Sequence, residues 1–511
     1  KSKIYKMPIV KAIISWMIKK RIHQMDLFKR YPMEVQSEVL TNLLKTAKNT
    51  EWGKKYHFNS INSISDFRER FPIQDYESLK SYIHRARMGE KNVLWPGEIK
   101  WFAKSSGTTS DKSKFIPVSK DALEECHFKG GKDSLALYSL NYPDTRILKG
   151  KGLLIGGSHQ IANFNNESFF GDISAVIIQN LPFWVHFIRT PDVSITLMDD
   201  WEEKIELMAR ATIKDNVTNI SGVPSWTLVL FKKILEITGK NNICEVWPDL
   251  ELFIHGGVSF IPYREQFKKF IPKTNMHYQE TYNASEGFFA VQDDPNSEGM
   301  LLMLDYGIFY EFIPASKVNE ENPESYTLEE ITLGENYAIV ISTNGGLWRY
   351  MIGDTVQFTS KNPFKIRITG RTRQYINTFG EELIVDNAEE AIKSASLKTG
   401  ALIREYSVAP IFIETNKQGS HQWLVEFEKE PDDINLFTEL LDNALKSLNS
   451  DYEAKRYKDL NLVMPELVKI RYGCFYEWLK EHGKLGGQHK VPRLSNSREF
   501  VDQILEMNRR K

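Results

Sequence analysis

Short apolar runs alternate with segments of helical periodicity from residue 150 onward, and this alternation limits the possible folds more than any other feature. The strand-like runs are "KGLLIGG", "NVTNISGVPS", "LELFIHGG" and "NMHYQETY", then "GIFYEFIP", "NYAIVIST" and "FKIRITG". The helical segments between them include "WEEKIELMARATIK" and "PSWTLVLFKKILEIT". Earlier in the chain, helical patterns cover residues 34–48 and 76–88 and a long stretch from Lys120. Strands separated by helices are typical of a mixed or parallel sheet, so the pattern predicts an α/β fold.

The length of the chain predicts more than one domain. It has 511 residues, and a single hydrophobic core stops growing at roughly 250 to 300 residues. After residue 372 the patterns begin again with "QYINTFGEELIVDNAEEAIKSA", "SVAPIFIET", "QWLVEFE" and "INLFTELLDNALKSLN". These elements are sufficient for a small α+β domain. We therefore expect a large domain with mixed sheets and helices over residues 1–373 and a smaller α+β domain over residues 374–511.

Composition and charge exclude several classes of partner. Lys and Arg total 66 against 67 Asp and Glu, so no overall field attracts nucleic acid. Cys126, Cys244 and Cys474 form no CxxC pair, which suits a reducing compartment. The apolar N-terminal stretch is interrupted by Lys11 and predicts an amphipathic helix packed on the body, with a membrane-surface helix as the alternative. We expect a cytoplasmic monomer that binds neither nucleic acid nor a membrane.

A polar loop lies between two apolar runs in "WFAKSSGTTSDKSKFIPVSKDAL", residues 101–123. Gly107 permits the backbone to turn its N–H groups inward, and Lys114 adds a positive charge. Hydroxyl groups come from Ser105, Ser106, Thr108, Thr109 and Ser110. Together these groups fit an anion-binding loop, but clusters of Ser, Thr and Gly are also common in surface linkers. The residues alone leave both interpretations open.

Several well-known catalytic motifs are absent from the sequence. It contains neither the Walker pattern GxxxxGK[ST] nor GxGxxG. The zinc motif HExxH and the nucleophile elbow GxSxG are also missing. The common kinase, dehydrogenase, metalloprotease and lipase interpretations therefore lose their main support.

Two carboxylates stand beside glycines at the ends of strand-like runs. In "ETYNASEGFFA", Glu286 directly precedes a glycine, where backbone can approach a ligand closely, and its carboxylate can hold a metal ion. In "GGLWRYMIGDTVQF", Asp354 follows Gly353 at the start of another predicted strand. A carboxylate beside a glycine is most often a turn residue, so the residue types alone assign no role to either.

Taken in order, "SSGTTSDKSKFIP", "TYNASEG", "GLWRYMIGD" and "ITGR" resemble the signature motifs of the adenylate-forming enzyme superfamily. With "GQHKVPR" at residues 487–493, the set is most similar to the auxin-conjugating acyl acid amido synthetases, the Gretchen Hagen family. The resemblance implies the large and small domains of adenylate-forming enzymes. The chain departs from the family pattern at Asn283, Trp348 and Met351, and these departures put the acceptor side of the site in doubt.

The resemblance also implies which residues bind ATP and Mg²⁺. Glu286 would hold Mg²⁺ near the α-phosphate, and Asp354 would accept hydrogen bonds from both ribose hydroxyls. Lys490, from the small domain, would reach the α-phosphate and the substrate carboxylate and would act in catalysis with Glu286 and Thr108. The other implied residues are Ser105, Ser106, Gly107, Thr108 and Thr109 around the β- and γ-phosphates, Gly257, Val258, Tyr282 and Ser285 beside the nucleotide, and Arg371 at the hinge.

The activity implied by the resemblance is ATP-dependent adenylation of a small carboxylic acid, followed by acyl transfer to an amine such as an amino acid. Two alternatives stay open, which are transfer to a thiol such as coenzyme A and nucleotide binding without turnover. The segment 150–235 is expected to line the acyl pocket, although its aromatic residues, including Trp226, also fit an ordinary core. The small domain is expected to rotate between the two steps.

Overall fold

The computed structural model describes most of the 511 residues. The described ranges are 20–106, 113–156, 162–165, 168–198, 200–256, 260, 263–318, 320–372, 375–381, 383–413, 418–457, 462–482 and 491–510. The helix expected at the N-terminus falls mainly on residues 1–19, outside these ranges. Within them, no helix combines the length and the apolar character needed to cross a membrane.

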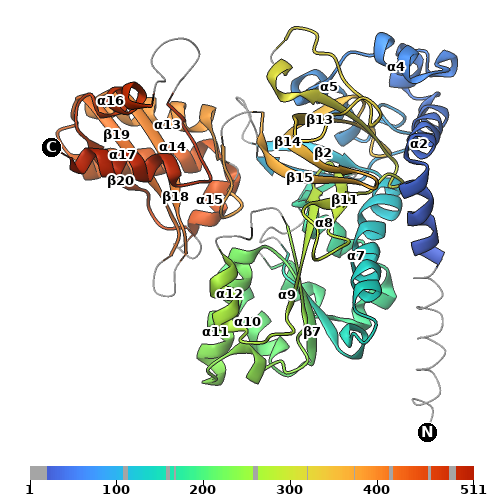
Figure 1. Cartoon of the computed structure of the whole chain (residues 1–511), viewed down its shortest axis with the longest axis horizontal. Coiled ribbons are helices and arrows are strands. Elements are labelled where there is room, and N and C mark those ends of the chain that lie inside the picture. Colours follow the sequence, from blue (N-terminus) through green and yellow to red (C-terminus); the bar gives the residue numbers. More distant parts are fainter. Residues whose placement is uncertain are drawn as a thin grey trace.

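One long mixed sheet organises the first 371 residues (Figure 1). Its eleven described strands are, in spatial order, β12 (Ile308–Pro314), β13 (Asn336–Thr343), β14 (Tyr350–Lys361), β15 (Phe364–Arg371), β11 (Met300–Leu302), β10 (Gly287–Val291), β9 (His277–Ala284), β8 (Leu252–His255), β7 (Val217–Ser221), β3 (Lys151–Leu154) and β6 (Arg189–Thr190). Strands β9, β8, β7, β3 and β6 pair in parallel. The strands from β9 to the other edge of the sheet, which are β10, β11, β15, β14, β13 and β12, pair antiparallel. The predicted mixed α/β sheet is therefore confirmed.

A second, four-stranded sheet lies beside the first and carries the polar loop. Its described strands are, in spatial order, β2 (Ser113–Val118), β1 (Trp101–Ser106), β5 (Ser168–Gly171) and β4 (Ala162–Asn165). Residues 20–30 are helical. The helices that follow are α2 (Pro32–Ala47), α3 (Glu51–Lys55), α4 (Ile64–Arg70), α5 (Tyr76–Arg87), α6 (Lys120–Ala122), α7 (Phe128–Asn141), α8 (Ile173–Gln179), α9 (Val193–Thr196), α10 (Trp201–Thr212), α11 (Pro224–Thr238) and α12 (Arg264–Phe270).

Local signals in the sequence explain where these helices begin and end. Asp75 and Ser78 form a reciprocal capping box at the start of α5. Pro224 occupies the first turn of α11, and Gly239 ends it with a φ of +65°, a conformation that glycine adopts without strain. Because these signals are local, the sequence predicted both helices closely.

Two hydrophobic clusters fill the large sheet region. One packs the antiparallel strands against α2, α4 and α5, and it includes Trp52, Phe67 and Tyr310. The other packs the parallel strands against α10, α11 and α12, and it includes Ile220 and Phe253. The two halves of the sheet therefore have separate cores.

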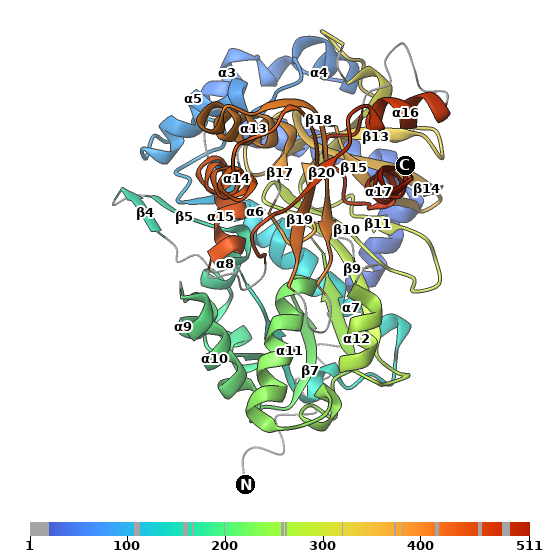
Figure 2. The ribbon, with the colours of Figure 1, turned by 90° about the vertical axis from the view of Figure 1, so that its left-hand side faces the viewer.

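Residues 375–510 form a smaller unit with its own core. It lies beside the large unit in Figure 1 and in front of it in Figure 2. A described three-stranded sheet, β18 (Leu402–Ile411), β19 (Ser420–Lys429) and β20 (Glu466–Ile470), lies between two layers of helices. The helices are α13 (Val385–Thr399), α14 (Ile434–Leu448), α15 (Ser450–Arg456), α16 (Cys474–Glu481) and α17 (Glu499–Arg509), and a short ribbon pairs β16 (Tyr375–Ile376) with β17 (Leu383–Ile384). The boundary between residues 373 and 374 stays a prediction.

Candidate active site

Asp354 lies within β14, at a point where the strand is distorted. Ala338 of β13 pairs with Thr355 and Val340 pairs with Met351, so residues 352–354 bulge opposite a single residue. Gly353 has a φ of +97°, which favours glycine. The expectation that Asp354 begins a strand is wrong, because residues before the glycine also pair with β13 and Asp354 follows four other residues of β14. A bulge of this kind redirects the side chain beside it.

Side chains from two other strands meet the Asp354 carboxylate. Tyr282 on β9 donates its Oη–H to Oδ2 over 2.6 Å, and Arg371 on β15 donates its Nε–H to Oδ1 over 2.7 Å. Arg371 is also the residue directly opposite Asp354 in the β14–β15 ladder. An ionised carboxylate has about four acceptor sites, so each oxygen can accept a further hydrogen bond. The carboxylate is therefore fixed in position and still able to bind a pair of hydroxyl groups.

Tyr282 is held in its protonated, donating form. Its ring is 5% exposed and packs against Phe289, with 4.8 Å between ring centroids. Burial, and then the negative charge of Asp354, raises the pKa of Tyr282 well above its usual value of 10. The phenol therefore stays neutral at physiological pH and remains a donor to Asp354.

Glu286 lies in the tight turn between β9 and β10. Ala284 and Gly287 pair across this turn, so Ser285 and Glu286 are its two central residues. The Glu286 side chain is half-buried, and its negative charge contributes to the raised pKa values of Tyr282 and Tyr350. The charge of Glu286 therefore acts on Tyr282, which donates to Asp354, although Glu286 and Asp354 are 68 positions apart in the sequence. Among the described residues, no three His, Cys, Asp or Glu side chains gather to hold a metal ion.

The segment Gln74–Tyr76 connects the two sheets, and sequence reasoning missed it. The N–H of Gln74 donates to the carbonyl of Arg349 over 2.8 Å, and the N–H of Met351 donates to the carbonyl of Gln74 over 2.9 Å. Two residues later, the hydroxyl of Tyr76 accepts from the N–H of Phe115 in β2 over 2.9 Å. This bridge ties β2, which follows the polar loop, to β14, which carries Asp354. The only sign of this bridge in the sequence was a tyrosine at the first helical position after the capping residue Asp75.

The polar loop itself joins β1 and β2. These strands pair antiparallel, with Ser105 opposite Lys114 and Ser106 opposite Ser113, so the loop is the connection of a hairpin. The structure describes the backbone of Ser105 and Ser106 at the end of β1. Six other predicted site residues lie outside the described ranges, namely Gly107, Thr108, Thr109, Gly257, Val258 and Lys490. Their roles stay predictions.

The three residues that depart from the family motifs lie in different parts of the structure. Trp348 is fully buried, its Nε1–H donates to the carbonyl of Leu94 over 3.0 Å, and its ring packs 4.6 Å from that of Phe58. Met351 packs against a small cluster that includes Ile313. Trp348 therefore belongs to the core, and Met351 is a partly buried side chain at the edge of a small cluster. Asn283 pairs with Phe288 beside the turn that holds Glu286.

Trp226, expected either in the acyl pocket or in the core, is 6% exposed and belongs to the cluster of the parallel half of the sheet. Its ring also contacts Lys455 of α15, with the Nζ atom 4.2 Å from the ring centroid. The core interpretation is therefore correct for most of this side chain, while one part of it faces the small unit.

Family models match almost the whole of the described chain. The GH3 family N-terminal domain matches residues 21–276, the GH3 family central domain matches residues 301–371, and the GH3 family C-terminal domain matches residues 386–499. These three matches follow the chain in the order expected for one continuous family architecture.

Curated relatives are distant but match over most of their length. The chain is 22% identical to indole-3-acetic acid-amido synthetase GH3.3 of Arabidopsis thaliana, over 90% of this chain and 89% of the relative. It is 21% identical to the 4-substituted benzoates-glutamate ligase GH3.12 of the same plant, over 92% of this chain and 94% of the relative.

Two solved structures share the fold. The AtGH3.15 acyl acid amido synthetase in complex with 2,4-DB aligns with a TM-score of 0.59 and 18% identity, over 93% of each chain. The 2-hydroxyisobutyryl-CoA ligase in complex with 2-HIB-AMP and CoA aligns with a TM-score of 0.57 and 11% identity, over 94% of this chain and 92% of the ligase.

Proposed function

Because this chain belongs to the GH3 family, we propose that it is an acyl acid amido synthetase that uses ATP to join a small carboxylic acid to an amino acid. The observation that carries the proposal is the Asp354 carboxylate, held by Tyr282 and Arg371 and still able to accept two more hydrogen bonds. A fixed carboxylate of this kind fits the 2′- and 3′-hydroxyls of a ribose. The amido synthetase names of the curated relatives support the same reaction.

The first half-reaction is adenylation. A carboxylate oxygen of the acid attacks the α-phosphorus of ATP, the bond from this phosphorus to the bridging oxygen breaks, and pyrophosphate leaves. The polar loop between β1 and β2 binds the departing phosphates through its hydroxyl and N–H groups. Lys490 stabilises the negative charge that develops on the α-phosphate oxygens. Catalysis here comes from positioning and electrostatics, so no nucleophilic side chain is needed.

Magnesium fits the residues present only as a loosely held ion. Mg²⁺ usually keeps several waters and binds one or two carboxylates together with substrate phosphates, and Glu286, in the turn between β9 and β10, would supply one carboxylate. When bound, the ion neutralises charge on the phosphates. Glu286, Thr108 and Lys490 are therefore the residues to which we assign the chemistry of this step.

The second half-reaction is acyl transfer. The amino nitrogen of the acceptor attacks the acyl carbon of the acyl-adenylate, the bond from this carbon to the phosphate oxygen breaks, AMP leaves, and the nitrogen loses a proton to solvent. Transfer to a thiol such as coenzyme A follows the same bond changes. The relatives favour the amine, because those described above are named amido synthetases or an amino acid ligase.

Pyrophosphate release over a panel of carboxylic acids tests the proposal. The wild-type protein with ATP and Mg²⁺ should release pyrophosphate with at least one aromatic or cyclic acid, and mass spectrometry should then find an amide with one amino acid. A thioester formed with coenzyme A, and no amide, would favour the thiol alternative. No pyrophosphate with any acid, in a sample that binds ATP, would favour a nucleotide-binding protein without turnover.

We also propose that residues 374–511 form a domain that rotates between the two half-reactions. The separate hydrophobic core of residues 375–510 supports this division. Small-angle scattering with and without a non-hydrolysable acyl-adenylate mimic should give different curves. Identical curves in a sample shown to bind the mimic would contradict the rotation.

A further inference from the structure

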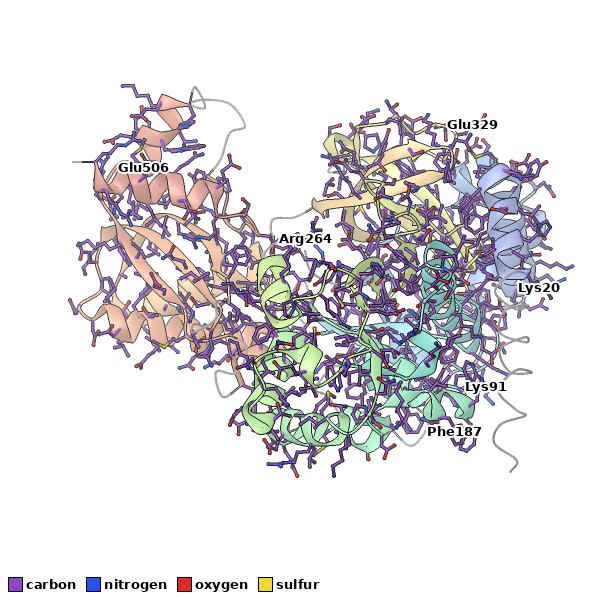
Figure 3. The ribbon with its side chains drawn as sticks, turned by 60° about the horizontal axis from the view of Figure 1, so that its bottom comes forward. Lys20, Lys91, Phe187, Arg264, Glu329 and Glu506 are labelled. Atoms are coloured by element: carbon purple, nitrogen blue, oxygen red, sulfur yellow. The ribbon has the colours of Figure 1, made fainter. Side chains whose placement is uncertain are left out.

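A short helix on the large unit carries exposed aromatic side chains. This 3-10 helix, η4 (Phe183–Phe187), connects α8 to β6, and none of its residues is buried. Phe183, Trp184 and Phe187 are 77%, 53% and 69% exposed, and Ile188, the next residue, is 44% exposed. Figure 3 shows Phe187 at the outer edge of the large unit, away from the small one. We call these four residues the aromatic patch.

The aromatic patch differs from the other exposed apolar side chains of the described residues. Single exposed apolar side chains, such as Leu397 of α13, are normal on a protein surface. Here four of the six residues 183–188 are large, apolar and exposed. The rings of Phe183 and Phe187 pack edge to face, with 5.3 Å between their centroids, so they form one surface. A contiguous exposed apolar surface indicates a contact site.

The aromatic patch lies at the amino ends of the parallel strands. The carbonyl of Ile188 accepts from the N–H of Gly152, near the start of β3, over 2.9 Å. Strand β3 pairs in parallel with β6 and β7, and β8 and β9 continue this half of the sheet. Tyr282 and the turn with Glu286 lie toward the carboxyl end of β9. The patch and the candidate active site are therefore at opposite edges of the parallel strands, so a surface that covers the patch leaves the site open.

Positive charge collects at the same edge of the sheet. Lys149 ends the 3-10 helix η3 (Ile147–Lys149) just before β3, and Lys214 lies between α10 and β7. Both lysines are exposed, and neither takes part in an ion pair with another described residue. Asp215 does not neutralise them, because it accepts from Lys151 over 2.8 Å and from the hydroxyl of Thr190 over 2.6 Å. Two lysines at this edge are thus available to an anionic partner.

A buried arginine adds to this charge. Arg189 directly follows the aromatic patch, is 5% exposed, and has no hydrogen-bond partner at any of its three side-chain nitrogen atoms. Asp192 attracts it electrostatically, but among the described residues the two form no ion pair. A buried charge without a partner costs free energy, and negative charge outside this edge of the protein offsets part of that cost. The field of Arg189 therefore favours the same anionic partner as the two lysines.

We propose that the aromatic patch docks the protein on a membrane surface that contains anionic lipids, with its rings among the headgroups and with Lys149 and Lys214 against the lipid phosphates. Aromatic rings combined with cations bind such an interface without any helix that crosses it. This inference does not depend on the proposed function, and it departs from the expectation of no membrane binding.

A second copy of the chain fits the aromatic patch less well. A large aromatic side chain buries about 150 to 250 Å², so three of them do not reach the roughly 800 Å² that each partner buries in a stable protein interface. A lipid surface needs no such area, because each inserted side chain and each cation contributes separately.

Sedimentation with vesicles tests the docking. The full chain, without ATP or acid, should sediment with vesicles of phosphatidylcholine and phosphatidylserine, and much less with phosphatidylcholine alone. Added salt should weaken this binding, because exposed charges are screened. Phe187→Ser should lower the partition coefficient by roughly tenfold or more, since removing one large apolar side chain from water changes an equilibrium by at least that factor. Lys214→Gln should lower it by roughly fivefold.

Matched variants on the small unit are the controls. Leu397→Ser removes an apolar side chain that is 78% exposed, and Lys398→Gln removes an exposed lysine beside it. Neither change should alter the partition coefficient. Urea denaturation should give the same midpoint for Phe187→Ser as for the wild type, because this side chain is exposed in the folded protein.

Three results overturn the proposal. They are no binding of the wild-type protein to phosphatidylserine vesicles, equal binding to both kinds of vesicle, and an unchanged partition coefficient in folded Phe187→Ser. Sedimentation velocity without vesicles tests the second copy. A wild-type dimer that Phe187→Ser dissociates, in a protein that binds no vesicles, would assign the aromatic patch to self-association instead.

Discussion

The motif "GGLWRYMIGD" supplies one member of each of two arginine–carboxylate pairs, Arg349 with Glu311 and Asp354 with Arg371. The two pairs differ in their surroundings. Arg349 and Glu311 are 4% and 0% exposed, with Nε and Nη2 of the arginine donating to the two carboxylate oxygens over 3.0 and 2.9 Å. The same guanidinium also donates to Ser325 Oγ over 2.8 Å and to the carbonyl oxygens of Arg68 and Phe71.

The pair of Asp354 and Arg371 is more open. Their side chains are 11% and 20% exposed, and the arginine reaches one carboxylate oxygen through Nε alone. A buried pair with every group bonded serves the fold, because nothing is left to bind a ligand. A partly open pair with unused acceptor sites can serve a ligand. Hydrogen-bond satisfaction, rather than residue type, separates the closed Arg349–Glu311 pair from the Asp354–Arg371 pair, which is open to a ligand.

The largest expected effect is on stability, from breaking the buried pair. Arg349→Met should lower the free energy of unfolding by about 3 to 5 kcal/mol, because Glu311 is left as an uncompensated buried charge. Urea denaturation of the purified protein measures this loss. Adding Glu311→Gln to Arg349→Met should recover part of the stability. If Arg349→Met is as stable as the wild type, the Arg349–Glu311 pair does not have the structural role that distinguishes it from the Asp354–Arg371 pair.

Lys490→Ala should slow adenylation about a hundredfold or more, or about 3 kcal/mol in activation free energy, because charge on the α-phosphate is no longer stabilised. Single-turnover pyrophosphate release measures the rate, and ATP affinity should stay within a few-fold of the wild type. Lys484→Ala, in the same segment, is the control and should behave as the wild type. Normal adenylation by Lys490→Ala would leave the small domain without a catalytic role in this step.

Asp354→Ala should weaken ATP binding by about 1.5 to 3 kcal/mol, the usual range for hydrogen bonds to a charged group. Calorimetric titration with ATP measures the affinity, and urea denaturation of the same sample should show a smaller loss of stability than Arg349→Met. Glu329→Ala, which removes an exposed carboxylate marked in Figure 3, should change neither quantity. Unchanged ATP affinity in folded Asp354→Ala would mean that the nucleotide site is misplaced.

The smallest expected effect is on the pH dependence of stability, and it comes from a buried histidine. Burial without an ion-pair partner keeps this side chain neutral, in contrast to the two charged pairs. Burial lowers the pKa of His127 from 6.5 to about 4. Below pH 6.5 the unfolded chain takes up a proton that the folded chain refuses, so stability falls as the pH falls from 6.5 to about 4. At pH 5.5 this loss is about 1.4 kcal/mol at most.

Replacement of this histidine isolates its contribution. His127→Gln should reduce the difference in unfolding free energy between pH 7.5 and pH 5.5, measured by urea denaturation at each pH. Part of the dependence should remain, because burial also lowers the pKa of His255, to about 3. An unchanged pH dependence in His127→Gln would mean that His127 does not titrate as its burial indicates.

The sequence predicted those parts of the fold that depend on local patterns. Hydrophobic patterns located α10, α11, β12 and β13 almost to the residue. Amphipathic periodicity marks the buried face of a helix, and an unbroken apolar run marks a strand buried on both faces, as β12 and β13 are. The motifs also brought Tyr282, Glu286, Asp354 and Arg371 into one expected site, and the structure places Tyr282 and Arg371 on Asp354. Their assignment to ATP came from the resemblance and was not contained in the residue types.

Tertiary structure alone decided the features that join distant segments. The bulge that moves Asp354 into the interior of β14 depends on its register with β13, and register is a property of two strands rather than one. The bridge from Gln74 to Tyr76 and the contact of Lys455 with Trp226 likewise join segments far apart in the sequence. Nothing local distinguishes Lys455 from an exposed helical lysine, because the Gly380 and Trp226 that it contacts lie far from it in the sequence. The sequence by itself therefore determined the elements and the family motifs, and only the packed chain decided which charges are satisfied, which remain open to a ligand, and which hold the domains together.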